Sequence, residues 1–171
     1  MTAGATYTSI ASTTVSSDTS SISFTSISGS YTDLILVLFG RSTRSATDDT
    51  VLFRLNSDSG NNYSRTRLLG TGSAVSSASD TNQSAMNFDI ISAASNASDT
   101  YSPNIYHIMN YSNTTINKTV LNRSNNTDAY LIAQVGLWRS TAAITRIDLS
   151  LGTGPNFKSG TTASLYGIAA A

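Results

Sequence analysis

His107 is the only histidine of the chain, and it is the first candidate for chemistry because there is no cysteine. A Ser–His–Asp hydrolase would have to use this imidazole, yet the sequence contains no G-x-S-x-G nucleophile elbow. A zinc site would need three carboxylates beside it, which is an unusual ligand set. His107 also lies between Tyr106 and Ile108 in a strand-like stretch. We therefore predict that it is a packing or interface residue, and we predict no catalytic residue, metal or cofactor.

All ten acidic residues are aspartates, and a pair of them could in principle hydrolyse a glycosidic bond. The candidates mostly lie beside turns, which Asp favours through hydrogen bonds to nearby backbone amides. They are Asp33, Asp48, Asp49, Asp58 and Asp89. The stretch 56–60 (NSDSG) faintly resembles a calcium loop, but there is no glutamate to supply the bidentate ligand at its end. We interpret these residues as turn formers, and we predict that the chain is not an enzyme.

The charges indicate an assembling protein and not a binder of nucleic acid. Ten basic residues balance the ten aspartates, whereas neutralising phosphates needs clustered Lys and Arg. A chain near its isoelectric point also tends to associate. The arginines between residues 41 and 67 make a mildly basic region, which could face an acidic partner or be a solvated strand face. They are Arg41, Arg44, Arg54, Arg65 and Arg67.

The composition favours an all-β fold. The chain has no glutamate and two lysines, and about a third of its 171 residues are serine or threonine. Exposed helix faces normally draw on Glu, Lys, Gln and Arg, whereas Ser, Thr and Asn suit the solvent face of strands and the turns. With 39% hydrophobic residues, one domain of this length can bury a real core.

Alternation with a period of two predicts about ten strands, separated by turns. We expect them over residues 20–27, 32–39, 51–56, 63–69, 84–91, 104–111, 117–123, 130–138, 144–151 and 162–168. Long loops are expected at 70–80 and 92–102, and Gly136 as a bulge or a point of close approach. The run at 32–39 (TDLILVLF) is apolar throughout, so it must be covered on both faces or lie at an interface. The pattern is typical of an antiparallel β-sandwich, jelly-roll-like in architecture.

The two ends set the expected domain organisation. Residues 1–20 are small and hydroxyl-rich, and we expect an N-terminal arm or an edge strand there, followed by a single β-sandwich domain over 21–171. The opening MTAGATYTSI has neither the basic region nor the apolar region of a signal peptide. The longest apolar run, 34–39, is too short to cross a bilayer. We therefore expect synthesis in the cytoplasm and no membrane partner.

Several segments resemble small structural proteins of tailed phages, especially cyanophages. The similar segments are GATYTSIASTTV at the start, YTDLILVLFG, MNYSNTT, KTVLNR, VGLWRSTAAI and SGTTASLYGI near the end. The resemblance runs along the whole chain. It implies a virion component with a β-sandwich fold, and it transfers no catalytic residue.

Together these observations predict a capsid decoration, or cement, protein on the capsid surface of a virion, made in the host cytoplasm. Its partner would be the major capsid protein, and a homotrimer is expected because jelly rolls commonly dock on capsids as trimers. The predicted interface residues are Tyr7, Ile10, Arg54, Arg65 and Arg67. The alternative is a receptor-binding or tail-fibre tip domain that recognises host surface glycans through Tyr, Asn and Asp on loops.

Overall fold

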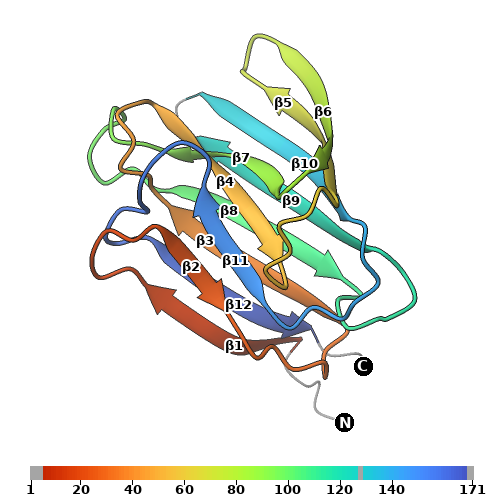
Figure 1. The fold of residues 1–171 in the computed structure, drawn as a ribbon. Coiled ribbons are helices and arrows are strands. Elements are labelled where there is room, and N and C mark those ends of the chain that lie inside the picture. Colours follow the sequence, from red (N-terminus) through yellow and green to blue (C-terminus); the bar gives the residue numbers. More distant parts are fainter. Residues whose placement is uncertain (1–5, 127–128, 169–171) are drawn as a thin grey trace.

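Two antiparallel sheets face each other in the chain (Figure 1). The structure is a computed structural model that describes residues 6–126 and 129–168, and of Asp89 the backbone alone. In these residues it has twelve strands and no helix. The prediction of an all-β antiparallel sandwich is therefore confirmed.

The larger sheet has eight strands in the order β1-β12-β3-β8-β9-β10-β5-β6, and every neighbouring pair is antiparallel. Its strands are β1 (Tyr7–Thr14), β3 (Asp33–Gly40), β5 (Tyr63–Gly70), β6 (Val75–Gln83), β8 (Ser102–Met109), β9 (Lys118–Asn126), β10 (Tyr130–Trp138) and β12 (Thr162–Ile168).

The smaller sheet has four strands in the order β2-β11-β4-β7. They are β2 (Ser21–Phe24), β4 (Asp48–Leu55), β7 (Met86–Ser92) and β11 (Ile147–Leu151). Consecutive strands repeatedly change sheet, so most connections cross from one layer to the other. This alternation makes the sandwich jelly-roll-like. The larger sheet is also wider, and the β5–β6 hairpin projects beyond β7 (Figure 1).

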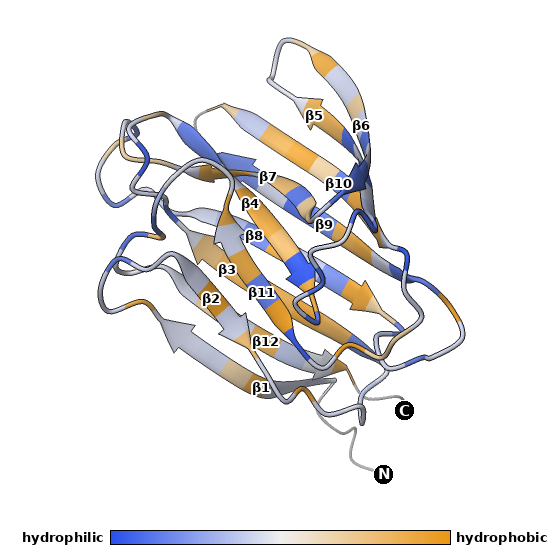
Figure 2. Cartoon of the chain, viewed as in Figure 1, coloured by the Kyte–Doolittle hydropathy of each residue, from blue (hydrophilic) through white to orange (hydrophobic). Residues whose placement is uncertain are grey.

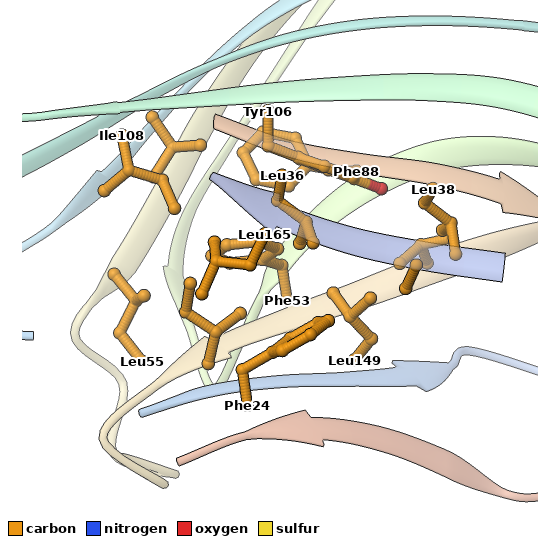
Figure 3. Packing of buried hydrophobic residues seen from close by; sticks show 14 of the residues in the cluster. Phe24, Leu36, Leu38, Phe53, Leu55, Phe88, Tyr106, Ile108, Leu149 and Leu165 are labelled. Carbon is orange, nitrogen blue, oxygen red and sulfur yellow. The ribbon is translucent and has the colours of Figure 1, made fainter. Parts of the chain in front are cut away.

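The core lies between the sheets and follows directly from the alternation in sequence. Strand β3 turns Leu34, Leu36 and Leu38 inward, and all three are fully buried. Strands β4 and β11 meet them with Phe53 and Leu149, as Figure 3 shows. Each such side chain contributes about 1.5–3 kcal/mol by leaving water. The packing of aliphatic side chains from both inner faces fixes which face of each strand points outward.

One predicted loop is wrong. The stretch 70–80 contains the connection at residues 71–74 and the first part of β6, which runs from Val75 to Gln83. Its sequence, VSSASDTNQ, has no apolar alternation because residues on both of its faces are largely exposed. An edge strand that extends past the second sheet buries nothing, so periodicity cannot reveal it.

The N-terminal segment is an edge strand over its described part. Residues 7–14 form β1, which pairs with β12 along its whole length, with a register shift between Ser9 and Ala11. Residues 1–5 of the expected arm lie outside the described residues, as do residues 127–128 and 169–171 of the expected domain. Within the described ranges, no helix is long and apolar enough to cross a membrane.

Candidate functional site: the outer face of the large sheet

The two solvent faces of the sandwich differ in chemistry. The outer face of the small sheet is mostly polar, as in ordinary antiparallel sheets. Examples are Ser21 and Ser23 on β2, and Asp148 and Ser150 on β11. The outer face of the large sheet is instead lined by aliphatic and aromatic side chains along its central strands. We call this surface the outer face.

The pairing register places the apolar residues of the outer face side by side. One row crosses the sheet through Tyr166, Ile35, His107, Leu121 and Val135, each opposite the next on the neighbouring strand. The adjacent row passes through Val37, Ile105, Arg123, Ala133 and Leu68. Figure 2 shows the hydrophobic stretch along β10 and the near-neutral colour of β1.

Exposure confirms that these side chains are uncovered in the isolated chain. The exposed fraction is 69% for Leu131, 57% for Leu68, 47% for Phe39 and 42% for Leu121. Single exposed hydrophobic residues need no explanation, but a contiguous apolar surface of this kind marks an interaction site.

Hydroxyl side chains border the outer face on both sides. On β1, Ser9 and Ser12 continue the two rows, and Ser12 Oγ lies 2.8 Å from Ser164 Oγ on β12. On the opposite edge, β6 continues them with Ser79 and Ser77. An apolar centre with a polar rim is the usual anatomy of a protein–protein interface.

The outer face is hollowed near its middle. A depression of about 450 Å³ is lined by Tyr7, Ile35, His107, Leu121 and Arg123, among others. A smaller one of about 290 Å³ adjoins it, and Tyr7 and Arg123 line both. Tyr7 meets Tyr166 edge to face, with ring centroids 6.5 Å apart. Tyr7 therefore lines both depressions, and Tyr166 lines the smaller one.

His107 lies on the outer face, beside this depression. Its Nε2 is 3.0 Å from Asp33 Oδ2, and Asp33 Oδ1 also accepts a hydrogen bond from the backbone N–H of Asn110. The imidazole is thus held by a carboxylate that also anchors the end of β8. Among the residues that the structure describes, no group of three or more His or Asp side chains could hold a metal ion.

Two of the predicted interface residues lie on β1 and have different surroundings. Tyr7 is 57% exposed and belongs to the outer face. Ile10 is partly buried and packs against the core. The structure thus brings only the first of the two to the candidate surface.

The predicted basic region does not form one exposed surface. Arg65, one of the predicted interface residues, does not lie on a solvent-exposed face, because only 10% of its side chain is exposed. Its Nε is 2.6 Å from Asp80 Oδ2 on β6, and its Nη1 donates to Gln134 Oε1 on β10 and to the carbonyl of Asn87 on β7. Arg67, two residues on, is on the same side of the strand.

The other arginines of this region hold backbone segments together. Arg54 lies on the outer side of β4 and donates to the carbonyl of Ser84. Arg41 is buried and donates three hydrogen bonds, at 2.8–3.0 Å, to the carbonyls of Asn96, Ala97 and Thr100. It clamps the loop between β7 and β8.

Most residues of the outer face were not predicted from the sequence. The only sequence pattern that indicated this face was the apolar run at 32–39, which was predicted to be covered on both faces or to lie at an interface. In the structure β3 contacts the core with one face only. The residues missed include Ile105, Leu121, Val135 and Tyr166. These residues come from four different strands, so the apolar surface becomes visible only when the order and register of the strands are known.

Comparisons with known proteins add little to this description. A scan against protein-family models finds no match, and neither does a search of curated proteins. Among solved structures, the exo-inulinase from Aspergillus awamori is similar, with a TM-score of 0.40 and 12% identity. That similarity covers 95% of this chain and 29% of the inulinase, so the chain spans less than a third of its length. The galectin LEC-6 from Caenorhabditis elegans has a TM-score of 0.34 and 10% identity, covering 93% of this chain and 96% of the galectin. Similarity at this level carries no argument about function.

Proposed function

We propose that this chain is a virion structural protein of a tailed phage, a capsid decoration protein that binds and stabilises the lattice of the major capsid protein. The single observation that supports an assembly role is the apolar outer face. A contiguous apolar surface of this kind is typical of a site that another molecule covers. The resemblance to phage structural proteins supports the choice of a virion as the assembly.

The proposed role needs no active site, nucleic acid or membrane. Binding at many equivalent lattice positions is multivalent, so modest single contacts suffice. Neutral net charge also lets copies lie close together without mutual repulsion. In this proposal the protein is made in the host cytoplasm and ends on the capsid surface.

The copy number in purified virions tests the proposal. Gel densitometry against the major capsid protein is expected to give on the order of hundreds of copies per particle, because decoration follows the lattice. A few dozen copies per particle or fewer would indicate a tail protein and not a capsid decoration protein. Complete absence of the chain from purified virions would overturn a structural role.

A second candidate is a receptor-binding or tail-fibre tip domain that recognises host glycans. The observation that favours it is the depression on the outer face, where Tyr7 offers a ring for stacking and His107 and Arg123 offer polar groups. Binding of the purified chain to host surface polysaccharide, lost on Tyr7→Ala, would support this candidate. Turnover of that polysaccharide would contradict both roles.

A further inference from the structure

We propose that the outer face is covered by the same face of a second copy of this chain, giving a closed two-fold dimer. This inference rests on the proposed function only in so far as both need the outer face to be buried in an assembly. It names the occupant as the chain itself, and the lattice contacts are then made by other surfaces.

The size of the outer face matches what a stable dimer needs. At about 4.8 Å per strand, its six central strands, β12 to β5 in sheet order, occupy a width of about 29 Å. Four outward positions require eight residues of a strand, which occupy a length of about 27 Å. The face therefore covers about 800 Å², which is the contribution of one partner to a standard interface.

The chemistry of the outer face is complementary to itself. Two sheets can pack face to face about 10 Å apart when their facing side chains are apolar, as the core of this same sandwich already does. The central rows supply Ile35, Leu121 and Val135 for such a layer. The hydroxyl rims of β1 and β6 would then surround the contact and remain partly solvated.

The charges on the outer face also suit a two-fold contact. Along the six central strands, the described charged side chains that this face carries are Arg123 on β9 and Asp33 on β3, which also contacts His107. A two-fold axis passing between them places Arg123 of each copy opposite Asp33 of the other. A buried face that carried one sign of charge would repel its own copy.

A two-fold contact of this kind differs from the trimer expected from the sequence. A flat face that meets its own copy is closed after two subunits, whereas a trimer needs two different surfaces on each subunit. It leaves the polar face of the small sheet and the loops free to contact a lattice.

Sedimentation of the purified full chain tests the inference. We expect a dimer for the natural chain and a monomer for Leu121→Arg, with the dimer dissociation constant raised by about 100-fold or more because a charge without a partner is buried. The matched control is Leu52→Arg on the outer side of β4, which should leave the dimer intact. Circular dichroism verifies that each variant keeps its β-structure.

Cross-linking provides a second test that does not depend on disrupting the surface. The chain has no cysteine, so Leu121→Cys and Ser150→Cys each carry a single thiol. The first thiol lies on the outer face, and the second lies on the solvent side of the small sheet. A short bismaleimide should join two copies of the first variant and none of the second. The opposite pattern, or a monomer at every concentration, would overturn the inference, and a trimer would favour the sequence-based expectation. A dimer that is missing from purified virions would instead contradict the proposed function and leave this inference standing.

Discussion

At the scale of single residues, two buried tyrosines show how the same side chain can stabilise or destabilise the fold. Tyr63 and Tyr106 are both fully buried. The hydroxyl of Tyr63 donates to the carbonyl of Asp58 at 3.1 Å and accepts from the backbone N–H of Leu55 at 3.1 Å. The hydroxyl of Tyr106 has no hydrogen-bond partner among the described residues. Burial raises the pKa of Tyr63 to about 12, and it raises the pKa of Tyr106 as well.

Removing these two hydroxyls should therefore have opposite effects on stability. We expect Tyr106→Phe to leave the free energy of unfolding unchanged or to increase it by up to about 1–2 kcal/mol, because an unpaired buried hydroxyl is lost. Tyr63→Phe should decrease it by about 1–2 kcal/mol, because two backbone groups lose their partner. Urea denaturation of both variants measures the difference. An equal loss in both would show that Tyr106 has a hydrogen-bond partner in solution.

At the scale of elements, the approach of the two sheets depends on a residue without a side chain. Gly136 lies on β10, where β7 passes directly over it. A Cβ at this position would be 2.5 Å from Met86 Sδ and 2.7 Å from Phe88 Cζ. The sequence-based expectation of a close approach at Gly136 is therefore confirmed. Phe88 also belongs to the aromatic cluster between the sheets, in which the rings of Phe53 and Phe88 meet edge to face with centroids 5.6 Å apart.

Gly136→Ala should separate β7 from β10. Overpacking of this kind typically costs about 1–3 kcal/mol. The matched control is Gly70→Ala on β5, where the nearest atom to an added Cβ is a carbonyl oxygen at 4.0 Å. The control should be neutral or slightly stabilising, because alanine restricts the unfolded chain. Thermal unfolding of both variants tests this, and equal melting temperatures would contradict the structural account of Gly136.

Strands that bury an apolar face could be read from the sequence, whereas strands and side chains defined by tertiary context could not. The strands predicted at 32–39, 51–56 and 130–138 correspond to β3, β4 and β10, whose inward positions carry apolar residues such as Leu36, Phe53 and Ile132. Strand β6 buries neither face, so it was missed. Arg65 was predicted to be an interface residue, yet its side chain is only 10% exposed and pairs with Asp80 on β6. Lys118 is buried and donates hydrogen bonds to the carbonyls of Ile116 and Thr141. No pattern in the neighbouring sequence predicts this burial.

At the scale of the whole molecule, two carboxylates hold distant segments together. Asp58 accepts hydrogen bonds from the indole N–H of Trp138 at 2.6 Å and the backbone N–H of Gly60 at 2.8 Å. Asp148 on β11 accepts from the guanidinium of Arg146 and from Ser23 and Ser57. Burial by itself would raise the pKa of each carboxyl, but these donors outweigh it and hold both pKa values below the usual 3.8.

These shifts predict a loss of stability in acid. A carboxyl whose pKa is lower in the folded state stabilises the fold fully above its unfolded-state pKa, and the contribution disappears as the pH falls through the folded-state value. Melting temperatures should therefore change little between about pH 7 and pH 5 on this account and fall below about pH 4.

Asp58→Asn isolates the share of this effect that belongs to one carboxylate. The amide can still accept from Trp138, but it has lost the negative charge and one acceptor oxygen, so the variant should melt below the natural chain at neutral pH. The difference should shrink towards zero as the pH falls below about 3, because Asp58 in the natural chain is then protonated too. Asp99→Asn, on the exposed loop between β7 and β8, is the control and should track the natural chain throughout. A difference between Asp58→Asn and the natural chain that persists undiminished to about pH 2 would mean that the geometry of the side chain, and not its charge, joins Trp138 to the turn after β4.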